Sequence, residues 1–287
     1  MKKYLDLFFE IISFRGLTNN TLKSYTSYLK SYLKYVETVL YKLPEDVTWP
    51  EMRAYISFIQ RSRGISDRTI NAHVALIRFF TEYVLHKQWD SYQMPSRKFD
   101  QYLPKVPTQD EARHFIETLS NLKHKAIVSI MYSAGLRVSE VCSLKYSDIS
   151  RENMSIRIAR CKNRSERFAI LSANALKILT QYWYEYGKPR DWLFPSTQKN
   201  GIKPIVQFTV NRIVNSHIGR LGWSQKINCH SFRHAFGTHL YENGTDLLTI
   251  QRLLGHKSLS STTLYVHLAA YKNGTIKSPF DSSGGCP

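Results

Sequence analysis

The sequence predicts a mainly α-helical protein in which a helical bundle is followed by an α+β domain with a small antiparallel sheet. Three observations support this. Apolar residues recur every three or four positions in three segments between residues 22 and 87. A stretch without such a period follows and contains "MPSRKFDQYLPKVP", with three prolines. Beyond it, the alternating segment "MSIRIAR" interrupts a series of helical patterns.

Three segments of the first domain are predicted to form amphipathic helices. The first, "TNNTLKSYTSYLKSYLKYVETVL", has Asn19 or Asn20 as its N-cap. The second, "TWPEMRAYISFIQRSRG", has Pro50 just inside its start and Gly64 just past its end. The third follows Ser66 in "SDRTINAHVALIRFFTEYVLHK". Together they predict a small bundle whose exposed faces carry many lysines and arginines.

The second domain is predicted to open with a helix that Thr108 caps, with Glu111 placed to complete a capping box. "KAIVSIMYSAG" is a nearly apolar helix, and "MSIRIAR" and "RFAIL" are expected to pair as a hairpin. Ser172 caps "ANALKILTQYWYEY", and Gly187 ends it. Further helices are predicted over residues 206–220, 231–243, 246–254 and 261–268.

We therefore place the first domain at residues 1–102, the second at 103–280, and a disordered tail at 281–287. The chain has 287 residues, which is long enough for two packed cores.

The charge balance points to a polyanionic partner. Lys and Arg number 40 against 22 Asp and Glu, a formal net charge of +18, which favours nucleic acid first and an anionic membrane surface second. No apolar run approaches the roughly 18 residues that span a bilayer, and Asp6 and Glu10 interrupt the apolar start. We expect a cytoplasmic protein that does not bind a membrane. The four cysteines are scattered without a CxxC pair, which argues against a zinc site and a disulfide framework.

Four short stretches concentrate polar groups that a core helix would exclude: "SAGLRVSEV", "ARCKNRSERF", "CHSFRHAFGTH" and "RLLGHKSLSSTTLYVHL". Each alone is weak evidence, and "LLGH" by itself is typical of a helix that ends in a left-handed glycine. Together they supply two arginines, a lysine, two histidines and a tyrosine: Arg137, Lys162, His230, Arg233, His256 and Tyr265.

This set matches the needs of phosphodiester transfer. Two guanidinium groups can neutralise the non-bridging oxygens, and a phenol can serve as the nucleophile. Histidines can pass protons near neutral pH, and a lysine can protonate the leaving 5′ oxygen. No carboxylate cluster of the kind that holds catalytic magnesium stands out, so we expect a reaction with no metal and no other cofactor.

The order and spacing of three boxes resemble the tyrosine recombinases, the integrase family that includes phage integrases and Xer proteins. "AGLRVSEVCSL" is similar to the first arginine box, "CHSFRHAFGTHL" to the HxxRH box, and "LLGHKSLSSTTLYVHL" to the segment from the Gly-His step to the tyrosine. The resemblance covers essentially the whole chain and implies the family's helical domain followed by its catalytic fold.

Residue by residue, the resemblance implies that Arg137 and Arg233 hold the scissile phosphate, with His256 donating a hydrogen bond to it or to the transition state. Tyr265 would be the nucleophile and His230 its proton acceptor. Glu140, at the position of the family's acidic residue after the first arginine, would support the site without contacting the phosphate. The alternative for Glu140 is an exposed glutamate favoured by a helix dipole.

The chain departs from the family pattern at the lysine hairpin, which reads "RCKNRSER" where the family often has Gly-Lys-Gly. The match places the general acid at Lys162, but Arg160 or Arg164 could take its register. Cys161 and Cys229 lie beside Lys162 and His230 in the chain and are interpreted as packing residues. We further predict that Gly255 ends a helix so that His256 projects toward the phosphate, and that Ser260 or Ser261 starts the helix that presents Tyr265.

The resemblance also implies a partner and a reaction. The two domains would clamp double-stranded DNA, cleave it through a 3′-phosphotyrosyl intermediate without metal or ATP, and act as a homo-tetramer on two DNA sites or a hetero-tetramer with a related recombinase. The task would be Xer-like resolution or the integration and excision of a mobile element. The alternatives are a type IB-like topoisomerase and a DNA-binding regulator on a decayed recombinase scaffold.

Overall fold

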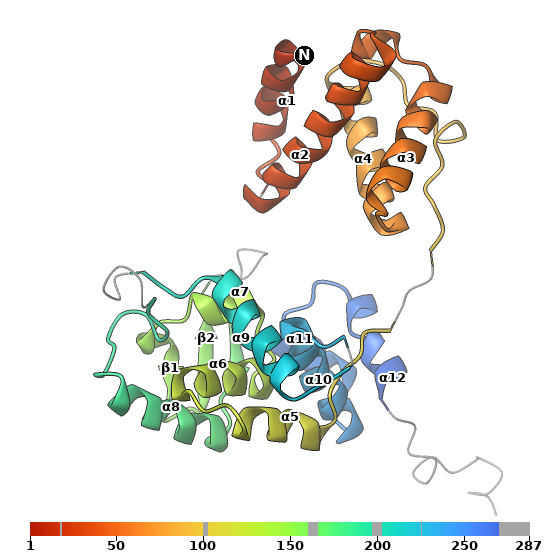
Figure 1. The fold of residues 1–287 in the computed structure, drawn as a ribbon. Coiled ribbons are helices and arrows are strands. Elements are labelled where there is room, and N and C mark those ends of the chain that lie inside the picture. The colour runs from red at the N-terminus through yellow and green to blue at the C-terminus, as the bar shows by residue number, and fades with distance from the viewer. Residues whose placement is uncertain (18, 100–102, 160–165, 197–202, 225, 270–287) are drawn as a thin grey trace, which may run out of the picture. The chain divides into compact units, whose positions relative to one another are not determined.

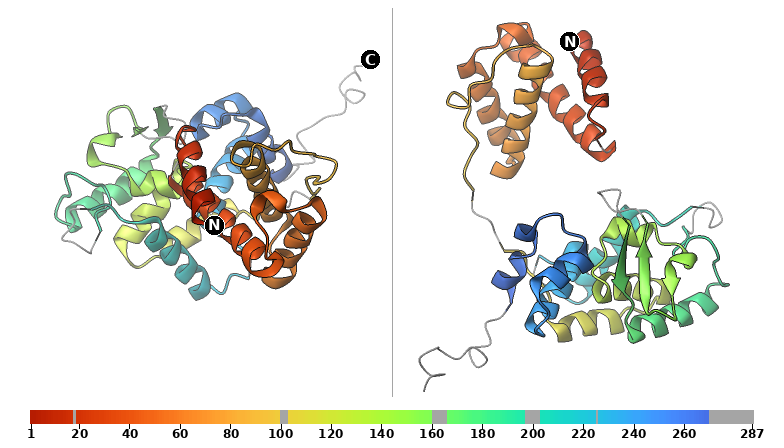
Figure 2. Two further views of the ribbon diagram at one scale, coloured as in Figure 1. Left: turned by 90° about the horizontal axis from the view of Figure 1, so that it is seen from above. Right: turned by 180° about the vertical axis from the view of Figure 1, so that it is seen from behind.

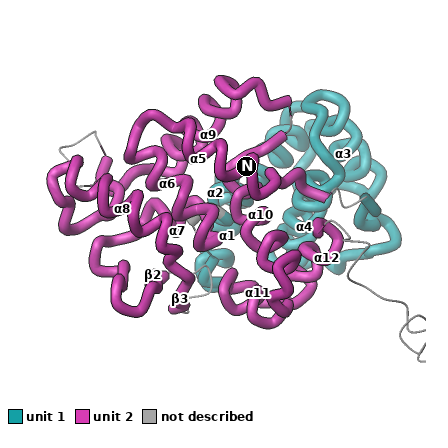
Figure 3. The backbone as a smooth tube through the Cα atoms, turned by 90° about the horizontal axis from the view of Figure 1, so that it is seen from below, with its two compact units in different colours: residues 1–101 teal, residues 102–287 magenta. Residues whose placement is uncertain are grey.

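The structure is a computed structural model of the chain, and it describes residues 1–17, 19–99, 103–159, 166–196, 203–224 and 226–269. The chain divides into two compact units, residues 1–101 and 102–287, each with its own hydrophobic core (Figure 3). Helices dominate both units, and a small antiparallel sheet lies in the second (Figure 1). The predicted fold class is confirmed.

The described part of the first unit is built from α-helices joined by short turns. A π-helical turn, Val36–Leu40, continues α2, and a 3₁₀ turn, Pro44–Asp46, precedes α3. The first predicted helix of the bundle begins at Asn19 or Asn20, so α1 is an addition to it. The α-helices are α1 (Lys2–Ser13), α2 (Asn19–Tyr35), α3 (Trp49–Arg63) and α4 (Asp67–Tyr83).

Local signals set the ends of these helices. Gly64 adopts φ 58° after the last residue of α3, a left-handed conformation that glycine enters without steric cost. The Ser66 hydroxyl accepts a hydrogen bond from the Thr69 amide and caps α4, as predicted. The expected asparagine cap of α2 lies outside the described side chains. The bundle closes around four aromatic side chains that are at most 1% exposed: Phe8, Tyr32, Tyr55 and Phe80.

In the second unit, the predicted hairpin is present and a third strand extends it. The sheet is antiparallel (Figure 2) and has the order β1-β2-β3. Ile156 lies opposite Ala169, and both residues are buried. Met154 was expected to begin the strand but lies in the preceding turn with φ 44°. The strands are β1 (Ile149–Ser150), β2 (Ser155–Ile158) and β3 (Arg167–Ile170).

The apolar helix α6 is the centre of this unit. Its residues from Ala126 to Met131 are all buried, and it packs against α8 and α10. The predicted caps are confirmed: Thr108 and Glu111 form a capping box at α5, and Ser172 caps α8. The helices here are α5 (Gln109–Glu117), α6 (Leu122–Ser133), α7 (Val138–Cys142), a 3₁₀ turn Tyr146–Asp148, α8 (Ala173–Glu185) and α9 (Gln207–Arg220).

The chain then forms α10 (Cys229–Glu242) and α11 (Leu247–Leu254), which Gly255 ends with φ 63°, as predicted. The helix predicted over residues 261–268, with its start at Ser260 or Ser261, does not form in that way. Ser258 caps a 3₁₀ turn, Leu259–Ser261, and α12 (Leu264–Leu268) begins after two threonines. The Ser258 hydroxyl accepts a hydrogen bond from the Ser260 amide, so the extended segment ends earlier than predicted. The predicted tail lies outside the described residues.

Candidate active site

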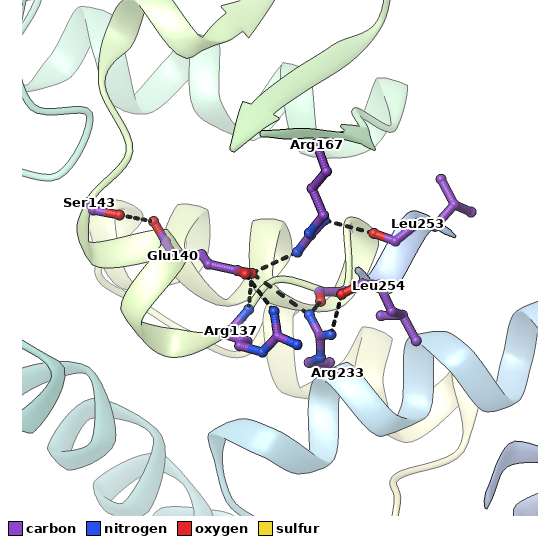
Figure 4. A network of polar contacts seen from close by, with 8 residues as sticks. Arg137, Glu140, Ser143, Arg167, Arg233, Leu253 and Leu254 are labelled. Carbon is purple, nitrogen blue, oxygen red and sulfur yellow. Dashed lines mark hydrogen bonds and ion pairs between the residues drawn. The ribbon is translucent and has the colours of Figure 1, made fainter. Parts of the chain in front are cut away.

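Two of the predicted site residues, Arg137 and Arg233, meet at the buried carboxylate of a third, Glu140 (Figure 4). Arg137 is the N-cap of α7 and Glu140 lies one turn further along it, while Arg233 comes from α10. Glu140 Oε1 accepts from Arg137 Nη1 at 2.8 Å, and Oε2 accepts from the Arg137 backbone amide at 2.8 Å. Because Glu140 is 3% exposed, the alternative of a solvated surface glutamate is wrong.

Arg233 is the most deeply placed cation of the site, with 1% of its surface exposed. Its Nη1 donates to the Gly135 carbonyl at 2.6 Å and its Nη2 to the Leu254 carbonyl at 2.5 Å. Glu140 Oε2 lies 3.7 Å from its Nη1. Burial, with the charge of Arg137, lowers the pKa of Arg233 to about 10, so the guanidinium still carries its charge at neutral pH.

Arg167, at the start of β3, is a member of the site that the motifs do not indicate. This side chain is 9% exposed, and its Nη2 donates to Glu140 Oε2 at 2.8 Å. Its Nη1 donates to the Leu253 carbonyl at 2.7 Å (Figure 4). One of 40 basic residues on a strand of four gives no sequence signal of such a contact.

Neutral histidines lie beside this cationic cluster. Burial and the charges of Arg233 and Arg137 lower the pKa of His256 to about 3 and also lower the pKa of His230. Nδ1 of His256 is 3.0 Å from the Thr262 hydroxyl, which is fully buried. His234, the last residue of the HxxRH box, was given no role in the sequence analysis; its ring lies 4.3 Å from that of His230, and burial lowers its pKa to about 4.

Tyr265 is packed inside its own unit. Its side chain is 0% exposed, and its ring lies parallel to that of His256 at 6.1 Å. Gly237 on α10 makes room for the ring, because a Cβ there would stand 2.5 Å from Tyr265 Cζ. The Tyr265 hydroxyl has no hydrogen-bond partner among the described residues. Burial raises its pKa to about 12, against the lowering effect of Arg233 and Arg137.

Replacing Tyr265 with phenylalanine is therefore expected to stabilise the free protein. A buried hydroxyl without a partner costs about 1 kcal/mol or more, so Y265F should raise the melting temperature by roughly 2–4 °C. Tyr182 is the matched control, because it is equally buried but donates to the Leu193 carbonyl at 3.0 Å. Y182F should lower the melting temperature. Calorimetry that finds both variants destabilised would contradict the buried, unpartnered hydroxyl.

The histidines also predict an acid-sensitive fold. Above pH 6.5 the folded and unfolded chains both hold neutral imidazoles. As the pH falls from 6.5 toward 4, the unfolded chain binds protons at His234 and His256 that the folded chain does not bind, so stability is lost. We expect each to cost about 1 to 2 kcal/mol between pH 7 and pH 5. Urea unfolding at both pH values should show a smaller loss for H256Q; an unchanged loss would contradict the assignment.

Lys162, with Arg160, Arg164 and Cys161, lies outside the described residues. The thiol of Cys229 is buried in the core, and burial raises its pKa to about 11. Within the described ranges, no group of three or more His, Cys, Asp and Glu side chains is placed to hold a metal ion. No helix in the same ranges is long and apolar enough to cross a membrane.

The site therefore combines positive charge, neutral imidazoles and a phenol. Arg137, Arg167 and Arg233 share the single carboxylate of Glu140, which leaves a formal charge of about +2. Such a cluster suits an anion with negative charge on two oxygens, and phosphate esters are of this type.

Comparisons with known proteins agree with these motifs. Residues 105–272 match the phage integrase family, and residues 4–91 match the N-terminal SAM-like domain of phage integrases. A putative integrase/recombinase, y4qK of Sinorhizobium fredii, is 34% identical over 95% of this chain and 86% of its own length. Tyrosine recombinase XerD of Oceanobacillus iheyensis is 32% identical over 88% of this chain and 89% of its own.

The fold is shared with a solved relative. The structure of a lambda integrase(75-356) dimer bound to a COC′ core site superposes with a TM-score of 0.73 at 21% identity, over 97% of this chain and 98% of that one. The family matches extend over both units, and the three boxes that carry the resemblance lie in the part matched to the integrase model. The chain belongs to the phage integrase family of tyrosine recombinases.

Proposed function

We propose that the protein is a site-specific DNA recombinase that cuts and rejoins DNA strands through a tyrosyl phosphodiester, without ATP. The observation that supports this proposal most directly is the cluster in which Arg137 and Arg233 flank the buried carboxylate of Glu140. Neutral His256 and the unpartnered hydroxyl of Tyr265 lie beside it. The names of the relatives, integrase/recombinase and tyrosine recombinase, support the same reaction.

The arginines are assigned to the scissile phosphate. Arg137 is 27% exposed at its side chain and can reach a non-bridging oxygen directly. Arg233 adds its charge from within the protein, where the lower dielectric strengthens its effect on the phosphate. Stabilisation of developing charge by such fixed groups is a large contribution to catalysis of this type.

Tyr265 is assigned as the nucleophile. Its oxygen forms the bond to phosphorus, the bond to the 5′ oxygen breaks, and a 3′-phosphotyrosyl linkage remains. The tyrosine proton passes to His230, which is neutral because burial and two arginines lower its pKa. Lys162 is assigned to protonate the leaving 5′ oxygen. Attack by a 5′ hydroxyl reverses each step, so one ester replaces another and no ATP is consumed.

His256 is assigned to the phosphate as a hydrogen-bond donor. The Thr262 hydroxyl contacts its Nδ1 at 3.0 Å, and when that hydroxyl donates, the imidazole proton resides on Nε2. The neutral Nε2–H group can then donate to a non-bridging oxygen. Glu140 supports these groups through Arg137 without touching the phosphate.

The proposal is tested by trapping the covalent adduct. Nicked duplexes from the DNA that flanks the gene are incubated with wild type or Y265F in the presence of EDTA, and the products are resolved on a denaturing gel. The expected result is a protein–DNA adduct that survives EDTA and is absent from Y265F. Salt-sensitive binding without an adduct on any genomic fragment would overturn the proposal in favour of a DNA-binding regulator.

The topoisomerase alternative differs in the step after cleavage. A type IB-like enzyme would relax supercoiled plasmid without a specific site, whereas a recombinase cuts at defined positions and exchanges strands. Mapping the adduct positions on a supercoiled plasmid separates the two: a few fixed sites support recombination, and dispersed sites with rapid relaxation support the topoisomerase.

Double-stranded DNA is the proposed partner, bound chiefly through phosphates by a chain of net charge +18. We further propose a tetramer on two DNA sites, formed by this chain alone or with a related recombinase. Sedimentation of the protein with its cleaved duplex should give a complex of four protomers and two duplexes. We propose that this activity takes place in the cytoplasm.

A further inference from the structure

A guanidinium group from β3 and one from α10 together cap the last turn of α11. The final carbonyls of a helix have no partner within it, so they need donors from outside. Here the Leu253 carbonyl accepts from Arg167 Nη1 at 2.7 Å, and the next carbonyl, that of Leu254, accepts from Arg233 Nη2 at 2.5 Å. Each positive charge also faces the negative end of the helix dipole.

Gly255 leaves the space that the Arg167 side chain occupies. A Cβ at Gly255 would stand 2.6 Å from Arg167 Cδ and 2.7 Å from its Nε, closer than packed atoms approach. The glycine therefore serves two purposes, since its φ of 63° ends α11 and its missing side chain leaves space for Arg167. The residue that follows is His256, so the turn that Arg167 holds is the turn that presents the histidine.

The other end of Arg167 is held by Glu140. Its Nη2 donates to Oε2 at 2.8 Å, the same oxygen that accepts from the Arg137 backbone amide. Arg167 thus links the start of α7 to the end of α11 by two hydrogen bonds from one rigid fork. Both of its terminal nitrogens are engaged in this way, so Arg167 acts on the site through Glu140 and the end of α11.

We propose that Arg167 is a positioning residue that fixes the C-terminal turn of α11, and with it His256, relative to Arg137 and Glu140. The inference rests on the proposed function for its effect on DNA cleavage, but the placement of His256 is a property of the free protein. A misplacement of about 1 Å at a reacting group can cost about 100-fold in rate.

The first arm of the experiment measures cleavage. Single-turnover rates on the nicked duplex are compared for wild type, R167A and R167K, with DNA affinity measured separately. We expect R167A to cleave about 100-fold more slowly with affinity within about threefold, and R167K to recover part of the rate because lysine can keep one of the two contacts. Equal rates for R167A and wild type would refute the proposal.

The matched control is R157A on β2. Arg157 also pairs with a buried carboxylate, Asp148, at 3.0 Å, and its second partner is the exposed Glu166 on the facing segment. These ion pairs are with two carboxylates away from α11, so the variant tests the general effect of losing a sheet arginine. Cleavage by R157A should stay within a few-fold of wild type; a loss as large as that of R167A would reduce Arg167 to a structural role.

The second arm follows His256 in the free protein by imidazole NMR, with H256Q to assign its signals. The groups that lower its pKa besides burial are Arg233, Arg137, His234 and His230, and its ring faces Tyr265 and Thr262. In R167A at a temperature where the protein is folded, we expect the titration midpoint of His256 to rise by at least one pH unit.

The internal reference for this arm is His239, which contacts Tyr132 at 2.9 Å elsewhere on α10. Its midpoint should be unchanged in R167A. A shift shared equally by both histidines, or by neither, would overturn the positioning role. A wild type that forms no adduct would instead count against the proposed function, while this arm would still decide the role of Arg167.

Discussion

Replacing Arg233 with lysine is expected to lower the rate of DNA cleavage by about 10²–10³-fold, because a fixed donor of charge and hydrogen bonds near the phosphate is lost. Lysine retains the positive charge but has no planar fork. It cannot donate to the Gly135 and Leu254 carbonyls at once, as the guanidinium does at 2.6 and 2.5 Å. The measurement is the single-turnover formation of the adduct on a nicked duplex at saturating protein.

Alanine at the same position should lower the free energy of unfolding of the second unit. R233A leaves two buried carbonyls without these donors and a void where a side chain 1% exposed had been, which we expect to cost about 3–5 kcal/mol. Arg151 is the control, an exposed arginine that contacts the Thr180 hydroxyl, and R151A should change stability by less than about 0.5 kcal/mol. Cleavage by R233K within tenfold of wild type would show that the fork is dispensable.

The fold was predictable where a local signal decides a boundary. Ser66, Thr108 and Ser172 cap helices because their hydroxyls accept from amides three residues on, and a sequence displays that spacing directly. The same holds for Gly64 and Gly255, where the chain reverses through φ values of 58° and 63°. These signals depend on residues within one turn of each other.

The sequence was less informative where distant contacts decide. β1 has two residues and forms by pairing Ile149 with Ile156, so its own pattern is too short to be recognised. The start of α12 differs from the prediction because Ser258, not Ser260 or Ser261, caps the preceding turn, and several serines close together compete for that position.

The candidate site likewise combines residues that local motifs indicate with residues that only the fold brings together. Arg137, Arg233 and His256 were identified from motifs, and the structure brings them together with Tyr265. The motifs could not reveal that Glu140 is buried or that Arg167 shares it, since residues 140 and 167 meet only through the fold. The unpartnered hydroxyl of Tyr265 likewise depends on Gly237 of another helix.

Replacing Glu140 with glutamine is expected to destabilise the free protein by about 3–5 kcal/mol, because a buried ion pair loses one partner. The carboxylate lies 2.8 Å from Arg137 Nη1, 2.8 Å from Arg167 Nη2 and 3.7 Å from Arg233 Nη1. In E140Q the three guanidinium groups repel one another without a counter-charge. Urea unfolding at neutral pH measures the loss.

An added anion should then repair the variant more than the wild type. Sulfate, a tetrahedral dianion like a charged phosphate, can replace part of the missing negative charge beside the arginines. Because sulfate also stabilises proteins in general, the control is E166Q, which removes an exposed carboxylate that pairs with Arg157 at 3.3 Å. We expect sulfate, compared with chloride at equal ionic strength, to raise the melting temperature of E140Q several degrees more than that of E166Q or wild type.

The two outcomes separate two roles of Glu140. If the carboxylate serves as the resting counter-charge of a phosphate-binding cluster, the anion substitutes for it and the excess stabilisation appears in E140Q alone. If Glu140 acts chiefly as the helix cap of α7, through its bond to the Arg137 amide, sulfate will stabilise all three proteins equally. The first result would mean that the arginines are held ready by a charge that the substrate phosphate partly takes over.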